Sequence, residues 1–223
     1  MRFVALQTYQ AQRRQKRLLP GGDDVSDLHF DAETHTYTLD GVEIPCVTDV
    51  LNDLIPGYKA GQWYLDRGTA VHACAALIAQ GVEFEHDPAI DGQVLALRRF
   101  FREMNPTVIA VEKPMVSAMY RFAGTCDLII EYGGSRHLKK AILDWKASLS
   151  KAVPYQLGAY GILADVDYGC AVEIRADGTY QMTKVIPLRL YKTKFLNLLS
   201  AYNIRRECGV KVDAGDDTER GVS

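Results

Sequence analysis

Two apolar stretches that each contain one Asp constrain the fold of this chain more than any other feature of its sequence. Residues 122–132 read FAGTCDLIIEY and residues 141–148 read AILDWKAS, with Gly133, Gly134 and Ser135 between them. Apolar runs of this length, separated by turn residues, predict neighbouring strands of one sheet. A buried strand rarely contains a carboxylate unless that group is paired or binds a cation. Both Asp residues are therefore candidate functional groups.

The second of these strands brings an acid and an amine together. Side chains two residues apart on a strand point to the same face, so Asp144 and Lys146 project together while Trp145 packs on the opposite face. A buried Asp144–Lys146 ion pair without any catalytic role is the alternative interpretation of this pattern.

The first strand is expected to follow the same period. Thr125, Asp127 and Ile129 would then share one face, and Gly124 would let another backbone or a ligand approach beside Asp127.

A predicted helix after Pro154 adds a polar face, since Gln156 and Tyr160 lie one turn apart. Two carboxylates can hold a hard divalent cation, which lowers the pKa of a bound water and neutralises charge that develops on a phosphate. An ammonium beside them can orient that water or stabilise the transition state. The residue types therefore indicate metal-assisted hydrolysis of a phosphodiester.

The order of these motifs resembles that of a known superfamily. GTCD at 124–127, DWK at 144–146 and QLGAY at 156–160 are similar to the successive motifs of the PD-(D/E)XK nucleases, in their RecB-like exonuclease branch. RGTAVH at 67–72 resembles the His motif of that branch. THTYTLDG at 34–41, followed by PCVTDVL, resembles phage-type and mitochondrial-genome-maintenance-type exonucleases.

This resemblance, over roughly residues 28–190, implies an α/β restriction-endonuclease-like core with a mixed sheet of about five strands flanked by helices. It implies a metal-dependent deoxyribonuclease, more specifically an exonuclease of DNA recombination, repair or replication. A catalytically idle DNA-binding protein of the same fold, or a metalloprotein that is not a nuclease, is the rival interpretation.

The resemblance also implies roles for individual residues. Mg²⁺ or Mn²⁺ would be bound by His72, Asp127, Asp144 and the backbone carbonyl of Trp145, with Lys146 positioning the attacking water. The further catalytic candidates that it implies are Glu112, Gln156 and Tyr160. On sequence alone, His72 can instead be an ordinary helix histidine, and Glu112 an edge carboxylate paired with a Lys.

An imidazole ligand has two consequences for metal binding. It shifts relative affinity toward Mn²⁺, so activity in Mn²⁺ is expected to equal or exceed that in Mg²⁺. Because the ligand must be neutral, metal binding is expected to weaken as pH falls through roughly 6 to 7.

Composition limits where DNA can bind. A net charge of −2 argues against a protein that coats nucleic acid, so contacts must come from local cations. A hydrophobic fraction of 48%, without an apolar run near the ~20 residues of a membrane span, predicts a soluble protein. The candidate phosphate contacts at element ends near the motifs are Arg67, Arg121, Arg136, Lys139, Lys140 and Lys151.

The five cysteines are scattered and form no C-x-x-C pair, which favours a reducing compartment. Some RecB-like nucleases hold an iron–sulfur cluster on four cysteines, but this chain lacks that C-terminal group, so no iron–sulfur cluster is expected. The cytoplasm of a bacterium or of a phage-infected host is the expected location, with mitochondria the alternative. DNA is the expected substrate, and a single-strand annealing or other recombination protein the expected partner.

The domain organisation is expected to be simple. Residues 1–22 are basic and would form a DNA-contacting arm, a solvated amphipathic helix or a mitochondrial transit peptide. Residues 23–208 would form the nuclease domain with a small N-terminal hairpin, and 209–223 a disordered tail. The other expected elements are a hairpin over 29–39, a helix capped by Thr48 or Asp49, helices over 62–79, 88–104 and 188–206, a strand over 107–119 with Val108, Ala110 and Glu112 on one face, and a hairpin of 168–175 with 180–187.

Overall fold

A mixed β-sheet forms the centre of the protein. The computed structural model describes residues 28–31, 34, 36–55, 62–133 and 139–209. Within 62–133, side chains are described from residue 67 onward. The strands are in the order β4-β5-β6-β7-β8, and a two-residue strand β9 pairs with β7. Their bounds are β4 Thr107–Ser117, β5 Phe122–Tyr132, β6 Lys139–Lys146, β7 Tyr168–Ile174, β8 Tyr180–Met182 and β9 Ile186–Pro187. The predicted mixed sheet of an α/β protein is confirmed.

The strand directions explain why the sheet is mixed. β4, β5 and β6 follow one another antiparallel, as tight connections allow, whereas β6 pairs with β7 in parallel. A parallel pair needs a crossover, and α5, Val153–Ala164, provides it. The turn at 175–179 returns the chain antiparallel into β8, in agreement with the predicted hairpin of 168–175 with 180–187.

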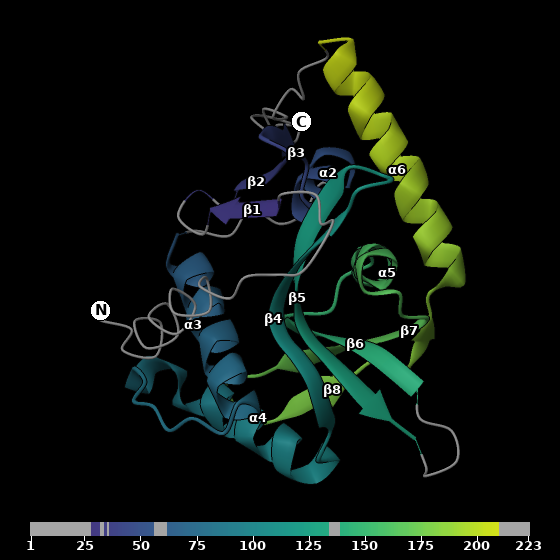
Figure 1. Ribbon diagram of the computed structural model, residues 1–223. Coiled ribbons are helices and arrows are strands. Elements are labelled where there is room, and N and C mark those ends of the chain that lie inside the picture. The colour runs from purple at the N-terminus through teal and green to yellow at the C-terminus, as the bar shows by residue number, and fades with distance from the viewer. Residues whose placement is uncertain (1–27, 32–33, 35, 56–61, 134–138, 210–223) are drawn as a thin grey trace, which may run out of the picture.

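Helices cover both faces of this sheet (Figure 1). On one face lie α3, Gln62–Ala79, and α4, Asp91–Met104, which follows the short 3-10 turn Pro88–Ile90. On the other face α5 packs with α6, Arg189–Glu207, and with α2, Val47–Leu54. The 88–104 segment is thus not one helix as predicted, because Ile90, with φ −119° and ψ 15°, departs from helical geometry where the 3-10 turn meets α4.

The two cores confirm how the β6 side chains alternate. Leu143 and Trp145 belong to the α3/α4 side, where the Trp145 ring meets the Phe100 ring edge-on at 5.1 Å. Ile142 belongs to the α5/α6 side. An edge-to-face aromatic pair contributes ~0.5–1.5 kcal/mol beyond its area burial. Trp145 therefore anchors β6 and fixes the opposite direction of Asp144.

A separate three-stranded antiparallel sheet precedes the core, in the order β1-β2-β3. Its strands are β1 Leu28–Asp31, β2 Thr36–Leu39 and β3 Val42–Ile44, and the first two form the predicted hairpin over 29–39. Asp40 and Gly41, both with positive φ, form the turn into β3. The helix α2 that follows begins earlier than predicted. Cys46 is its N-cap, because Asp49 Oδ2 accepts the Cys46 N–H at 2.8 Å.

Several expectations fall outside the described residues. These are the basic segment 1–22, the tail beyond Gly209, and the turn residues Gly134 and Ser135. Among the described helices, none combines the length and apolar character needed to cross a membrane.

Candidate active site

The centre of the site is a carboxylate on β5 that faces a histidine on α3. The Nδ1 atom of His72 lies 3.1 Å from Asp127 Oδ1. The Asp127 side chain is 10% exposed and that of His72 is 35% exposed, so the pair lies at the edge of the core where a solute can reach the imidazole. The R-G-T-A-V-H helix and the G-T-C-D strand thus converge as the motif order predicts.

A second carboxylate joins this pair from β4. The β4–β5 register pairs Val111 with Leu128 and Lys113 with Cys126, which places Glu112 opposite Asp127. Ligand atoms of His72, Glu112 and Asp127 all lie within 4.8 Å of one another. An imidazole nitrogen with two carboxylates is a donor set that suits a divalent cation. We call these three residues the ligand cluster.

The backbone at Glu112 is strained. Its φ is +44°, in the left-handed region that a non-glycine residue rarely adopts. Such a conformation costs ~1–3 kcal/mol and persists where the surroundings determine it, commonly at functional sites. The β4 register also shifts between Val108 and Ala110. The predicted shared face of Val108, Ala110 and Glu112 is therefore wrong, because strict alternation requires a regular strand.

The alternation of β5 is interrupted at Asp127 as well. Cys126 and Ile129 both pack on the α5/α6 side, whereas Leu128 and Ile130 pack on the α3/α4 side. The prediction that Thr125, Asp127 and Ile129 all share one face requires unbroken alternation and is therefore wrong. Asp127 thus contacts His72 from a position opposite Glu112, the residue of β4 with a left-handed backbone.

The third carboxylate, Asp144, binds the lysine of the D-W-K motif. Lys146 Nζ lies 2.6 Å from Asp144 Oδ2, as the period-2 argument predicts. The Asp144 side chain is 2% exposed and that of Lys146 is 22% exposed, so the ammonium extends from a buried acid toward the surface. Asp144 is not part of the ligand cluster.

A hydrogen bond from a backbone amide to a carboxylate connects the two Asp motifs. The β5–β6 register ends at the Leu128–Leu143 pair, and beyond it the Trp145 N–H donates to Asp127 Oδ2 at 2.8 Å. The Asp127 side chain thus replaces a ladder carbonyl. The amide nitrogen of Trp145 is the group in contact with Asp127, and its carbonyl remains a predicted metal ligand.

Electrostatics separate the roles of the charged groups. Burial alone would lower the pKa of His72, but the Asp127 charge and hydrogen bond, aided by Glu112, outweigh it and raise that pKa to about 9. Burial favours protonation of Asp127, yet the cationic His72 and Lys146 hold its pKa below the usual value. Burial and the neighbouring Asp127 charge raise the pKa of Asp144 despite Lys146. Asp144, in turn, raises the pKa of Lys146 against the effect of burial.

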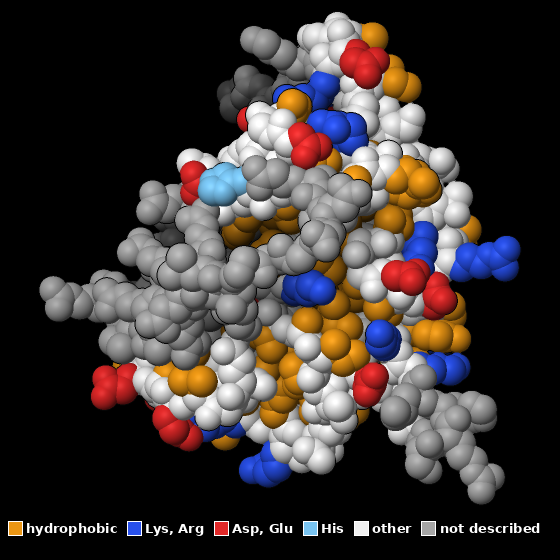
Figure 2. Space-filling view, in the orientation of Figure 1, with side chains coloured by type: hydrophobic (Ala, Val, Ile, Leu, Met, Phe, Trp, Pro, Cys, Tyr) orange, Lys and Arg blue, Asp and Glu red, His pale blue; other side chains and the backbone are white. Residues whose placement is uncertain are grey.

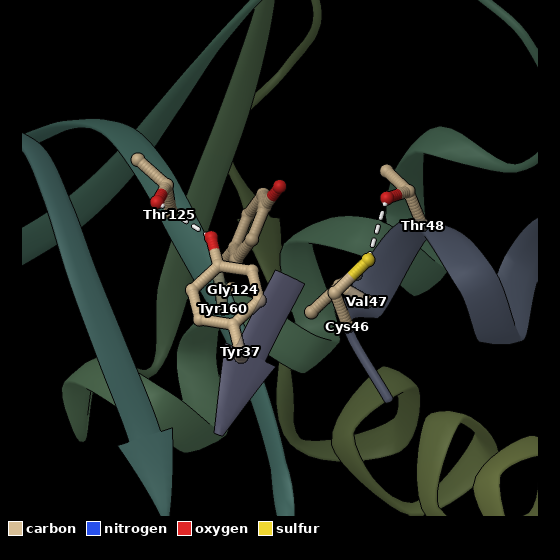
Figure 3. A pocket seen from close by; sticks show the side chains of 7 residues that line it. All are labelled: Tyr37, Cys46, Val47, Thr48, Gly124, Thr125 and Tyr160. Atoms are coloured by element: carbon tan, nitrogen blue, oxygen red, sulfur yellow. Dashed lines mark hydrogen bonds between the residues drawn. The ribbon is translucent and has the colours of Figure 1, made fainter. Parts of the chain in front are cut away.

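The α5 motif lies beside a small hollow of about 30 Å³ (Figure 3). Gln156 Nε2 donates to the Tyr160 hydroxyl at 3.2 Å, and the Tyr160 ring is buried in the wall of the hollow. Gly124 meets protein side chains here, since a Cβ atom on it would lie 2.9 Å from Val47 Cγ2 and 3.0 Å from Tyr160 Cε1. Close packing of α2 and α5 accounts for this glycine.

One residue near the site escaped sequence analysis. Tyr37 of β2 is 1% exposed, and its hydroxyl lies 2.7 Å from Thr125 Oγ1, two residues before Asp127 (Figure 3). This contact fastens the N-terminal sheet to β5 next to the ligand cluster. The inward position of Tyr37 in the alternating T-Y-T-L strand was its only sequence signal.

The predicted phosphate contacts do not gather in one place. Lys and Arg side chains are spread singly over the face in Figure 2, with Asp and Glu between them. Lys139 and Lys140 lie at the start of β6, ~20 Å from Lys146 at its end. Lys139 Nζ instead stands over the Tyr168 ring, 4.7 Å from its centroid.

The other cations lie on different elements. Arg67 is half-buried on α3, Arg121 is exposed in the β4–β5 turn, and Lys151 is exposed just before α5. Arg136 lies outside the described residues. Of this set, Arg67 is on the same helix as His72, and Lys151 follows the Lys146 strand.

No family model matches the sequence, and no curated protein matches it. Among the solved structures that the chain resembles is LHK-Exo in complex with dAMP, with a TM-score of 0.37, 12% identity, and coverage of 74% of this chain and 93% of that chain. The alkaline exonuclease LHK-Exo from Laribacter hongkongensis gives a TM-score of 0.36, 14% identity and coverage of 74% and 94%. SSO0001 gives a TM-score of 0.40, 13% identity and coverage of 92% of each chain. The TM-scores of all three lie below 0.5 and the identities at 12–14%, so the assignment below depends on the site residues alone.

Proposed function

We propose that this protein is a divalent-metal-dependent nuclease that hydrolyses DNA phosphodiester bonds, and that it acts as an exonuclease. The observation that carries the proposal is the ligand cluster of His72, Glu112 and Asp127 beside the Asp144–Lys146 pair. A protein that only binds DNA needs neither a cation site nor a buried acid that holds an ammonium there. The idle DNA-binding alternative is therefore disfavoured.

The cation would be held by the ligand cluster, with Asp144 and the Trp145 carbonyl as the further ligands that the resemblance implies. A bound Mg²⁺ or Mn²⁺ lowers the pKa of water and neutralises charge on a phosphate. The mixed nitrogen and oxygen donor set supports Mn²⁺ as the better ion.

The chain's own residues divide the remaining work. Lys146 stays protonated because Asp144 raises its pKa, so it serves as a fixed donor to water or phosphate oxygen and not as a base. Asp144 holds that ammonium in place at 2.6 Å. Gln156 and Tyr160 support this arrangement from α5, next to the strand that carries Asp127.

The test is cleavage of linear and circular DNA, labelled at either end of the linear form, with Mg²⁺ or Mn²⁺. An exonuclease degrades linear DNA from an end and spares the closed circle. Binding without hydrolysis in either metal would instead establish the idle DNA-binding alternative.

The variants must separate catalysis from folding. Asp127→Ala would leave the buried Trp145 N–H without its acceptor, which costs ~1–3 kcal/mol. Asp127→Asn keeps an oxygen acceptor and removes the charge, so we expect a folded protein that has lost cleavage. Asp144→Ala should also abolish cleavage. The matched control is Asp167→Asn, since the Asp167 side chain is 77% exposed and pairs with Lys192 away from the cluster. Normal cleavage by Asp144→Ala would contradict the proposal.

A further inference from the structure

The turn between β4 and β5 displays exposed apolar side chains. Met119 is 82% exposed, the highest value among the large hydrophobic residues that the structure describes, and Tyr120 next to it is 40% exposed. Arg121 follows and is also exposed. The turn therefore presents a flexible thioether and an aromatic ring side by side to solvent, next to a cation. We call residues 118–121 the hairpin tip.

The hairpin tip is a firmly held projection. The Arg121 N–H donates to the Ser117 carbonyl at 2.8 Å, and the Tyr120 N–H donates to the Ser117 hydroxyl at 3.2 Å. Immediately after the tip, Phe122 is fully buried and its ring lies 5.0 Å from that of Phe195 on α6. The core therefore fixes the base of the tip while Met119 and Tyr120 stand in solvent.

The same hairpin connects the tip to the ligand cluster. Glu112 precedes the end of β4 at Ser117 by five residues, and Asp127 follows the start of β5 at Phe122 by five residues. At ~3.3 Å per residue the tip lies about 17 Å from the cluster. This length corresponds to about five steps of a stacked nucleic-acid strand at ~3.4 Å each.

Cations accompany this path. Lys113 is exposed on β4 next to Glu112, and it forms no ion pair with any residue of the described ranges. One explanation for a lysine on an edge strand such as β4 is that it prevents the strand from pairing with another chain. Together with Arg121 at the tip, however, Lys113 gives the hairpin a positive group at each end, which complements a phosphate backbone.

We propose that the hairpin tip is a wedge for the end of duplex DNA, an inference that rests on the proposed nuclease function. Met119 and Tyr120 stack on the terminal base pair and separate its strands. One strand then runs along the hairpin, past Lys113, to the ligand cluster. Apolar side chains that enter between base steps unstack them, and aromatic rings stack on bases of any sequence.

The first test compares three end-labelled substrates in Mn²⁺: a blunt duplex, the same duplex with five unpaired nucleotides at its end, and a single strand. The variant is Met119→Ser with Tyr120→Ser, and the control is Leu190→Ser, an exposed apolar residue of α6 at 57% exposure. The wedge variant should lose at least about tenfold on the blunt duplex, which corresponds to one lost stacking contact. It should match the wild type on the other two substrates, as the control should on all three.

The second test does not require cleavage. With the Asp144→Ala protein, a 2-aminopurine in the terminal base pair should brighten on binding as the pair opens, and the two serine substitutions should remove this change. Equal rates for wild type and wedge variant on the blunt duplex, or equal losses on all three substrates, would overturn the wedge. If the wild type cleaves no DNA but the tip-dependent brightening persists, the wedge stands and the nuclease function fails. Brightening that is absent or independent of the tip overturns the wedge.

Discussion

Metal binding should release a proton from His72, and this prediction tests the ligand cluster without any assay of cleavage. The pKa of His72 in the metal-free protein is raised to about 9, chiefly by Asp127 opposing the effect of burial. An imidazole binds a metal only when it is neutral. At pH 7 the cation must therefore displace about one proton per site, and at pH 9 about half a proton.

The magnitude follows from the same pKa. The neutral fraction of His72 rises about fiftyfold between pH 7 and pH 9, so the apparent affinity for Mn²⁺ should rise by up to that factor. Solvent screening at a side chain that is 35% exposed makes fiftyfold an upper value. From an ordinary histidine, the sequence predicts that metal affinity changes with pH at roughly pH 6 to 7. The contact with Asp127 moves this pH range upward.

The free energy of unfolding of the metal-free protein should fall over the pH range in which its affinity for metal rises. The folded-state pKa of His72 lies above its ordinary value of 6.5, so the stabilisation from the pair with Asp127 is fully present below pH 6.5. It is lost as pH rises toward 9. The metal-free protein should therefore become less stable over the range in which it gains affinity for metal.

The assay is calorimetric titration with Mn²⁺ in buffers of different ionisation enthalpy, which counts released protons directly. His72→Ala should bind more weakly, release no proton near pH 7 and show a flat pH profile. His86→Ala, which removes a histidine paired with Asp91 on the protein periphery, should behave as wild type. Absence of proton release by the wild type at pH 7 would refute the assignment of His72 as a ligand.

Four further outcomes are expected. Lys146→Ala should retain Mn²⁺ affinity and lose about 10²-fold or more in cleavage rate; an unchanged rate would reduce D-W-K to a structural pair. Glu112→Gly should be more stable than Glu112→Ala by about 1 kcal/mol in urea denaturation, because glycine tolerates the φ of +44°, and equal stabilities would argue against backbone strain. The Mn²⁺-to-Mg²⁺ activity ratio should fall in His72→Ala, and a ratio equal to that of the wild type would exclude an imidazole ligand. DNA binding should weaken steeply with salt, as measured by fluorescence anisotropy, and salt-independent affinity would exclude phosphate contacts as its source.

Local periodicity was sufficient to predict part of the site. A strand has a strict two-residue period, so the contact of Asp144 with Lys146 and the burial of Trp145 on the opposite face follow from sequence alone. The i, i+4 relation on a helix likewise places Gln156 beside Tyr160. Both arguments hold because β6 and α5 are regular where these residues lie.

The rest depended on irregular backbone and on distance. Glu112 remained ambiguous in the sequence because its direction depends on a left-handed residue and on a register shift earlier in β4, neither of which a period describes. Lys139 and Lys140 are close to D-W-K in sequence, but an extended strand places them ~20 Å away from Lys146. Residues that are only a few positions apart on an extended strand lie far apart in space. The polar turn before β6 gives no sign in the sequence of how far the strand carries them from the site.

Two ion pairs stabilise the buried carboxylates of the site in the structure, and they bear on how the proposed cation would bind. His72 lies 3.1 Å from Asp127 and Lys146 lies 2.6 Å from Asp144, so each buried carboxylate has a cationic partner of its own. Unpaired buried carboxylates would be strongly destabilising, and these partners remove that cost before any metal binds. The two cations differ in one respect. His72 titrates near pH 9, whereas the raised pKa of Lys146 keeps the ammonium charged above that value. If the ligand cluster binds a divalent ion as proposed, His72 would lose its proton while Lys146 would stay on Asp144. The group proposed to orient the attacking water would then stay fixed while the ligand cluster changes its charge.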